Sequence, residues 1–275
     1  MVNVFSFCLF GEPTSINGRV EKTDETDDEI PKGGYYQGLI ENIELVRKYY
    51  PGWIVYAYLG EDVPESFAMK LIHTYSNVQI RRTGVFGYKN TVFRFFAIDE
   101  PNVDLMFVRD TDSRIHWKDR WAIQSFIKQS VFNFHIIRDH TQHTSRIGAG
   151  MWGMRKGALT ERMRDLFNRW NPVWAGHGNI HNLEGYGIDQ NFLASAIYPK
   201  VKHNALVTYS NSRLFDGEVG VEFPFEWTND MYVGRVESLP ISESFWLRER
   251  ENPPQQTKIT VTPAALLFHG LSFKK

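Results

Sequence analysis

The chain has 275 residues, which is long enough to bury a substantial hydrophobic core and excludes a structural mini-protein. Hydrophobic residues make up 42% of it and aromatic residues 15%, a composition unlike that of a disordered chain. The formal net charge is -1, so there is no chain-wide basic field to hold nucleic acid or an anionic membrane. Any anion must therefore be bound by a local group of residues.

A single cysteine, Cys8, excludes an intramolecular disulfide and any multi-cysteine metal site. The apolar run at residues 4–10 is too short to span a bilayer, and no lysine or arginine precedes it as in a signal peptide. We therefore expect a cytoplasmic protein without a transmembrane segment.

Strands and helices are expected to alternate along the first 114 residues. The apolar run at 2–10 predicts a buried strand, and the polar stretch at 11–34 predicts a solvated loop that orders over a ligand. Apolar periodicity then predicts a helix, a strand, a helix, a short strand and a helix, at residues 38–50, 53–59, 66–75, 78–81 and 91–99. Residues 105–108 are continuously apolar, which is typical of a strand buried on both faces.

The pattern is looser after residue 114. It predicts helices near 118–129, 160–170 and 190–197, and strands near 134–137, 151–154 and 205–209. Residues 215–263 show little clear periodicity, so we expect loops and short strands there. Because no repeat or linker is visible, we expect a single α/β domain over 1–275, with a mixed, mainly parallel sheet flanked by helices. Its nucleotide-binding part would be about 1–114, and its acceptor and sugar part about 115–275.

Asp110 and Asp112 follow the apolar run at 105–108 directly, at the expected carboxyl end of a buried strand. Carboxylates at i and i+2 point to the same side of an extended chain and can share one cation. Their oxygens suit Mg²⁺ or Mn²⁺, and a metal with few protein ligands keeps positions free for phosphate oxygens. The alternative is a turn in which Asp110 caps the next helix and Asp112 pairs with Arg109 or Arg114.

These two residues resemble the Asp-x-Asp motif of the nucleotide-sugar-dependent glycosyltransferases of GT-A fold, in particular the glycogenin and lipopolysaccharide-galactosyltransferase branch. The resemblance implies a Rossmann-like GT-A fold in which Asp110 and Asp112 hold Mn²⁺ or Mg²⁺ against the donor diphosphate. His269 is similar to the C-terminal histidine that completes the metal site in that branch.

Further segments resemble the same branch, in the same order along the chain. Tyr35 begins a Tyr-x-x-Gly segment similar to one in which the tyrosine contacts the uracil ring. Arg94, sixteen residues before the first aspartate, resembles a basic residue near the donor phosphates. Gly148 and Gly150 resemble a small-residue strand start that faces the donor sugar, although that branch has Asn where this chain has Gly148.

The second half of the chain contains the candidate sugar and catalytic positions. Asp189 and Gln190 resemble the Asp-Gln segment beside the reacting sugar, which implies a catalytic role. Arg138 and Asp139 resemble donor-sugar-binding positions. Lys275, at the end of the chain, is a candidate to neutralise the leaving diphosphate.

Each of these residues also has an ordinary structural alternative. For Arg94 it is an ion pair with Asp99 or Glu100 on a helix surface, for the two glycines a turn or bulge, and for Asp189 a helix N-cap. The adjacent arginine and aspartate at 138 and 139 would form a surface pair. The C-terminal histidine would be a core or surface residue, and the terminal lysine a solvated end.

The motifs together predict transfer of a sugar from a nucleoside-diphosphate sugar, most simply a UDP-sugar, to a hydroxyl of a glycan, protein or lipid acceptor. The resemblance favours retention at the anomeric carbon, whereas inversion would make Asp189 a general base.

Two other functions compete with this prediction. A phosphohydrolase of the haloacid-dehalogenase type also places Asp-x-Asp after a strand, with the first aspartate as nucleophile, but its motif continues with Thr or Val where this chain has Ser113. A carbohydrate-binding module without catalysis would also account for the aromatic content.

Overall fold

The computed structural model describes residues 1–11, 15–16, 19–20, 34–170, 185–210, 212–225, 232–236 and 258–261. The strands in these ranges are β1 (Val2–Leu9), β2 (Ser15–Ile16), β3 (Arg19–Val20), β4 (Ile54–Leu59), β5 (Val78–Arg82), β6 (Val103–Val108), β7 (Phe134–Arg138), β8 (Trp152–Arg155), β9 (Ala205–Tyr209), β10 (Val219–Glu222) and β11 (Lys258–Val261).

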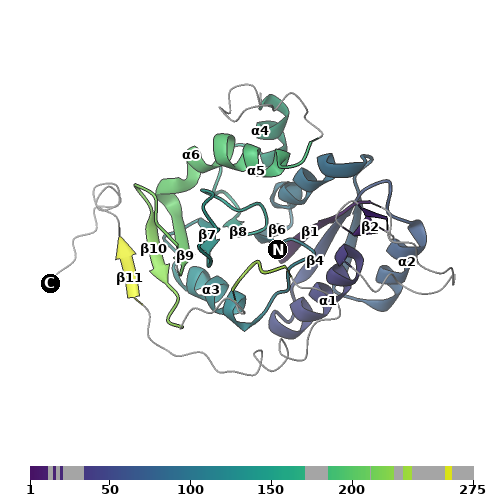
Figure 1. Ribbon diagram of the computed structural model, residues 1–275, viewed down its shortest axis with the longest axis horizontal. Helices are drawn as coiled ribbons and strands as arrows, with labels where there is room; N and C mark the ends of the chain where they lie inside the picture. Colours follow the sequence, from purple (N-terminus) through teal and green to yellow (C-terminus); the bar gives the residue numbers. More distant parts are fainter. Residues whose placement is uncertain are drawn as a thin grey trace.

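Nine of these strands form one sheet, in the order β11-β10-β9-β7-β8-β6-β1-β4-β5 (Figure 1). Parallel pairs join β1 to β4 and β6, β4 to β5, and β9 to β7 and β10. Strand β8 runs antiparallel between β6 and β7, and β11 is antiparallel to β10. The expected α/β architecture with a mixed, mainly parallel sheet is confirmed.

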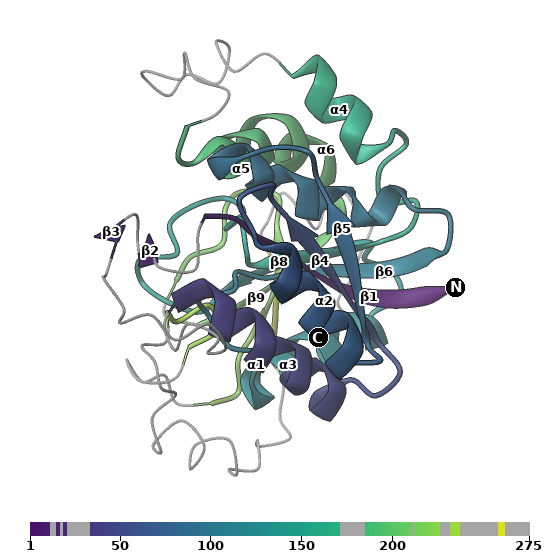
Figure 2. The same ribbon diagram turned by 90° about the vertical axis from the view of Figure 1, so that its right-hand side faces the viewer.

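Helices cover both faces of the sheet (Figures 1 and 2). They are α1 (Gly34–Tyr49), α2 (Glu65–Thr74), the 3₁₀ helix η1 (Gly87–Asp99), α3 (Trp117–Lys128), α4 (Met163–Arg169), α5 (Ile188–Phe192), the π-helical turn η3 (Leu193–Ile197), α6 (Tyr198–Val201) and the 3₁₀ turn η4 (Lys202–Asn204). Side chains of α1, α2 and α3 form one apolar core. Those of η1, α4, α5, η3 and α6 form a second core on the opposite face.

The two central strands supply both cores because their residues alternate between the faces of the sheet. In β1, Phe5 and Phe7 enter the core under α1, while Val4 enters the core under η1. In β6, Phe107 and Met106 divide in the same way. All five side chains are completely buried, as expected of continuous apolar strands with helices on both sides.

The helix predicted at 91–99 begins earlier than expected and is wound as a 3₁₀ helix. Asn90, in its first turn, donates hydrogen bonds to the carbonyls of Leu9 (2.9 Å) and Tyr58 (3.1 Å). These bonds attach the start of η1 to the carboxyl ends of β1 and β4. The helix predicted at 160–170 is shorter, because Asp99 accepts the amides of Met163 and Arg164 and so fixes the first turn of α4.

The other predicted elements occur at or within a few residues of their expected positions, including short strands β10 and β11 in the segment 215–263. Most of the loop expected at 11–34 lies outside the described residues, apart from β2 and β3. In the described part of the chain, no helix is long and apolar enough to cross a membrane.

Candidate functional site

Asp110 and Asp112 lie where the sheet topology predicts a ligand site. The chain proceeds from β1 to β4 and β5 on one side, then returns to place β6 on the other side of β1. The strand order therefore reverses between β1 and β6, and open α/β sheets bind ligands beyond the carboxyl ends of the strands at such a point. Asp110 and Asp112 follow the carboxyl end of β6, beside the end of β1.

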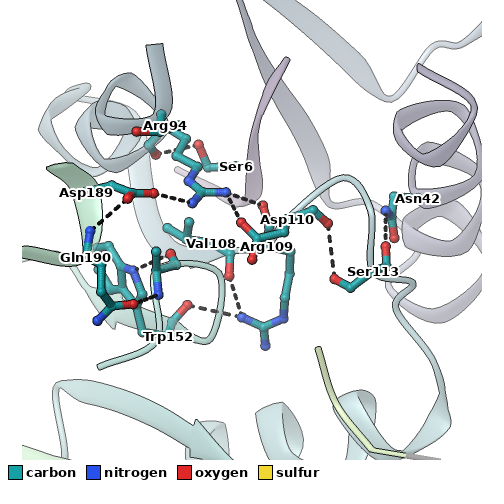
Figure 3. A network of polar contacts seen from close by, with 12 residues as sticks. Ser6, Asn42, Arg94, Val108, Arg109, Asp110, Ser113, Trp152, Asp189 and Gln190 are labelled. Carbon is teal, nitrogen blue, oxygen red and sulfur yellow. Dashed lines mark hydrogen bonds and ion pairs between the residues drawn. The ribbon is translucent and has the colours of Figure 1, made fainter. Parts of the chain in front are cut away.

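Arg94 on η1 joins two of the predicted site residues (Figure 3). Its guanidinium forms a short contact with Asp110 Oδ1 and a 2.9 Å ion pair with Asp189 Oδ2. The Arg94 side chain is 3% exposed, whereas that of Asp110 is 44% exposed. Asp110 and Asp189, far apart in the sequence, are thus held together by one buried cation, and Asp110 keeps an open side.

The orientation of Arg94 is set by the backbone around it. Its guanidinium also donates to the Arg109 carbonyl (3.1 Å), and Ser6 Oγ on β1 donates to the Arg94 carbonyl (2.6 Å). η1 is therefore attached at this residue to the middle of β1 and to the chain just after β6. A planar guanidinium offers several donors in one plane, which allows contact with both carboxylates and a carbonyl together.

Gln190, at the start of α5, holds the glycine segment against the site. Its side-chain amide donates to the Ile147 carbonyl, and its Oε1 accepts the Ala149 amide at 3.0 Å. The backbone amide of Gln190 donates to Asp189 Oδ1 at 2.8 Å. Gln190 therefore brings the Asp-Gln segment into direct contact with the segment around Gly148 and Gly150. The sequence resemblance implies that both segments lie beside the donor sugar.

Two glycines allow the backbone to approach the aspartate loop. A Cβ atom on Gly150 would lie 2.2 Å from Asp110 Oδ2 and 2.8 Å from its backbone nitrogen. A Cβ on Gly38 in α1 would lie 1.8 Å from the Thr111 carbonyl oxygen. Since no side chain fits at such distances, glycine at these positions determines how closely the loop is enclosed. The Gly148 position is less crowded, with Met151 atoms at 3.1 and 3.2 Å.

The electrostatics of the loop favour a bound cation. Burial and then the neighbouring Asp110 carboxylate raise the pKa of Asp112 from 3.8 to about 6. Burial and then the charges of Asp112 and Asp110 raise the pKa of Tyr35 from 10.0 to about 12, which places Tyr35 near both carboxylates. Two adjacent carboxylates that repel each other in a partly buried site are stabilised by a shared positive charge.

The hard oxygen ligands of Asp110 and Asp112 fit Mn²⁺ or Mg²⁺. Within the described ranges, no group of three or more His, Cys, Asp or Glu side chains is placed to hold a metal. His269, the predicted third ligand, and Lys275 both lie outside the described residues.

Gly148 and Gly150 do lie in a turn, which the Met151 amide closes on the Gly148 carbonyl at 3.0 Å, but the structural alternatives for Asp110, Asp112 and Asp189 are not what the structure contains. The N-cap of α3 is His116, and Arg109 and Arg114 pair with Asp119 and Glu41 rather than with Asp112. The N-cap of α5 is Gly187, with φ of +83°, so Asp189 does not cap that helix. Neither aspartate of the Asp-x-Asp segment nor Asp189 is therefore accounted for by a cap.

Arg138 and Asp139 are buried in separate ion pairs, not in a surface pair with each other. Arg138 binds both carboxylate oxygens of Glu218 at 2.7 Å. Asp139 accepts from Lys118 Nζ at 2.8 Å and from the Val233 amide at 2.9 Å. Both side chains are almost fully buried, so each has a structural role in this part of the fold. Sugar binding by these two residues stays a prediction.

Sequence reasoning missed Asn42, which shapes the aspartate loop from α1. Its amide donates to the Ser113 carbonyl at 2.8 Å, and its Oδ1 accepts the Ile115 amide at 3.0 Å. Asn42 lies in the buried stripe of the helix, beside Leu39 and Val46. A polar side chain within an apolar helical stripe is the signal that indicates such a role, because a buried amide needs hydrogen-bond partners.

Comparisons with known proteins assign neither a family nor a function to this chain. No protein-family model matches the sequence, and no curated protein matches it. Among solved structures, 4-diphosphocytidyl-2C-methyl-D-erythritol synthase from Anaerococcus prevotii is similar over 76% of this chain and 86% of that chain, with 8% identity and a TM-score of 0.41. At this level of similarity, neither an activity nor a ligand transfers to the present chain.

Proposed function

We propose that this protein is a metal-dependent glycosyltransferase that moves a sugar from a nucleoside-diphosphate sugar to an acceptor hydroxyl. A UDP-sugar is the expected donor, and a glycan, protein or lipid is the expected acceptor. The observation that carries the proposal is the junction of Asp110, Arg94 and Asp189 at the carboxyl end of β6, where the strand order reverses.

Asp110 and Asp112 would hold Mn²⁺ or Mg²⁺, with His269 as the predicted third ligand. Such an ion neutralises the charge that develops on a departing diphosphate. The open side of Asp110 and the raised pKa of Asp112 support this role, because both carboxylates lack a full complement of positive charge. A chain of net charge -1 would in this way bind one diphosphate without a general affinity for polyanions.

The protein's own groups would position the donor. Arg94 keeps Asp110 and Asp189 at fixed orientations and offers positive charge beside the metal ligands, as expected of a residue near the donor phosphates. Tyr35 would stack on the base, and Lys275 would neutralise the leaving diphosphate. Gly148 and Gly150 would admit the sugar close to the backbone, since neither bears a side chain.

Asp189 would act at the reacting sugar, with Gln190 fixing the adjacent loop. The ion pair with Arg94 keeps Asp189 oriented, which suits stabilisation of positive charge at the anomeric carbon and the retention of configuration that the sequence resemblance favours. An inverting reaction would instead require Asp189 to accept a proton from the acceptor hydroxyl.

Replacing both metal-binding aspartates tests the proposal. In the variant Asp110→Asn/Asp112→Asn, we expect Mn²⁺-dependent release of UDP from a panel of UDP-sugars to fall by about a hundredfold or more, because neutral amides hold the cation poorly. Asp104→Asn is the matched control, since Asp104 is an exposed carboxylate on β6, the strand that leads into Asp110 and Asp112. Wild-type activity in the double variant would rule the assignment out.

The same preparations distinguish the competing functions. Turnover of phosphate monoesters without any nucleotide sugar would favour a phosphohydrolase with Asp110 as nucleophile. Calorimetric binding of glycans that needs neither Mn²⁺ nor nucleotide would favour a non-catalytic binding module.

A further inference from the structure

A second cavity lies on the outer side of η1, apart from the aspartate site. Its volume is about 330 Å³, within the range of about 300–1,000 Å³ typical of small-molecule pockets. It is bounded by the end of β5, by Phe93 and Phe96 of η1 and by the start of α4. Neither aspartate of the Asp-x-Asp segment lines it, nor does Asp189, although η1 contributes to both places.

The cavity is lined by more positive than negative charge. Four arginines, Arg81, Arg82, Arg162 and Arg164, face two acids, Asp99 and Glu100, which gives the lining a formal charge of +2. Arg82 also pairs at 2.5 Å with Glu65, outside the lining, so the net charge with that partner is +1. Both acids already have partners within the fold. Glu100 forms two 2.9 Å hydrogen bonds with Arg81, and Asp99 accepts two backbone amides of α4 at 2.8 and 2.9 Å.

The arginines without an acidic partner lie at the start of α4, Arg162 just before the helix and Arg164 in its first turn. Arg162 and Arg164 form no ion pair with any described residue. The Arg164 guanidinium lies over the Phe96 ring, with 4.6 Å to the ring centroid, and this contact holds it at the wall of the cavity. A guanidinium stacked on a ring still presents its N–H donors at its edge, which suits it to bind an anion.

Tyr58 on β4 supplies an unused hydrogen-bonding group. Its side chain is 5% exposed and lines the cavity, yet its hydroxyl has no hydrogen-bond partner among the described residues. Burial raises the pKa of Tyr58, so the hydroxyl stays protonated and able to donate. The hydroxyl is not one of the fully buried polar atoms that lack a partner, so it is accessible from the cavity and can donate to a ligand oxygen there.

We propose that this cavity binds the phosphate group of a small phosphorylated ligand, with Arg162, Arg164 and Tyr58 as donors. A phosphate carries about -1.5 to -2 charges at neutral pH and three acceptor oxygens, which suits a positively charged lining with two arginines that have no acidic partner and a separate hydroxyl donor. The rings of Phe93 and Phe96 would contact the organic part of a phosphomonoester. This site stands independently of the proposed glycosyl transfer.

Calorimetric titrations of inorganic phosphate and of phenyl phosphate into the intact 275-residue chain test the site. EDTA in the buffer excludes phosphate held through a metal at Asp110 and Asp112. We expect one saturable phosphate site per chain, tighter binding of phenyl phosphate, and affinity reduced at least about tenfold in Arg162→Gln/Arg164→Gln. Tyr58→Phe should weaken binding several-fold.

Arg169→Gln is the matched control, because Arg169 lies on the same helix but does not line the cavity. Arg169→Gln should bind phosphate like the wild type. Asp110→Asn/Asp112→Asn should also bind phosphate like the wild type, so this experiment tests the cavity separately from the proposed glycosyl transfer. Absence of saturable phosphate binding in the wild type, or undiminished affinity in a folded Arg162→Gln/Arg164→Gln variant, would overturn the proposal. If phenyl phosphate binds no more tightly than inorganic phosphate, the proposed contact of Phe93 and Phe96 with the organic part of the ligand is wrong.

Discussion

Single residues determine how the aspartate loop is enclosed, and Gly150 is the most constrained of them. The positions of the Asp110 carboxylate and backbone nitrogen leave no space for a Cβ atom at residue 150. Arg94 holds the other oxygen of the same carboxylate. Arg94 therefore fixes the position of one oxygen of Asp110, and the other oxygen occupies the space that a side chain at residue 150 would fill.

This arrangement predicts a specific defect in Gly150→Ala. The added methyl group must displace the Asp110 carboxylate or the strand beside it, so Mn²⁺ affinity measured by calorimetry should fall at least about tenfold. Gly148→Ala is the comparison, because its Cβ would meet only the Met151 side chain, at 3.1 Å, and the affinity should change less. Equal Mn²⁺ affinity in Gly150→Ala and the wild type would contradict this account.

At the scale of elements, α3 depends on a neutral histidine at its N-cap. The His116 Nδ1 accepts the Lys118 amide at 3.2 Å, and its Nε2 lies 3.4 Å from the Tyr232 carbonyl oxygen. The first of these contacts requires an unprotonated Nδ1. Burial lowers the pKa of His116 from 6.5 to about 4, so the ring is neutral in the folded protein at pH 7.

The lowered pKa predicts an acid-sensitive contribution to stability. Between pH 6.5 and 4 the unfolded chain binds a proton at this residue and the folded chain does not, so the free energy of unfolding falls as pH falls through that window. The loss from this group is on the order of 3 kcal/mol.

His116→Asn keeps an N-cap acceptor but does not titrate, which isolates the effect. Urea denaturation at pH 7.5 and pH 4.5 should show a smaller loss of stability in His116→Asn than in the wild type. An identical pH dependence in the two proteins would show that His116 does not titrate in this way.

At the scale of the molecule, one sheet extends through both predicted parts of the chain. β6, from the first part, pairs with β1 on one edge and with β8, from the second part, on the other. The second apolar core likewise combines η1 with α4 and α5. Separation at residue 114 would expose an apolar strand edge and half of a core.

We therefore predict one cooperative unfolding transition for the whole chain. Tryptophan fluorescence and far-ultraviolet circular dichroism should give coincident urea transitions, because both parts share a sheet and a core. A fragment of residues 1–114 should aggregate or stay unfolded, since β6 would present an unpaired edge. Two separate transitions in the intact chain would instead indicate two independent domains.

The elements were predictable because their signals are local. Continuous apolar runs marked β1 and β6, and helical spacing marked α1, as the structure confirms. The residue at which η1 begins was not predictable, because the start of this helix depends on hydrogen bonds from Asn90 to strands that are distant in the sequence. Sequence periodicity reports which residues are apolar, but it does not report such long-range bonds.

Part of the candidate site could also be predicted from the sequence, and part required the tertiary structure. Asp110, Asp112 and Asp189 could be chosen from residue type and position relative to a buried strand, since the carboxyl end of such a strand is where α/β sheets bind ligands. That Arg94 bridges Asp110 and Asp189, that Gly150 encloses Asp110, and that Arg138 and Asp139 are buried with other partners all required the folded chain. The physical reason is that spacing along the chain constrains neighbours within a strand or helix, whereas contacts between elements depend on how the sheet and its covering helices pack.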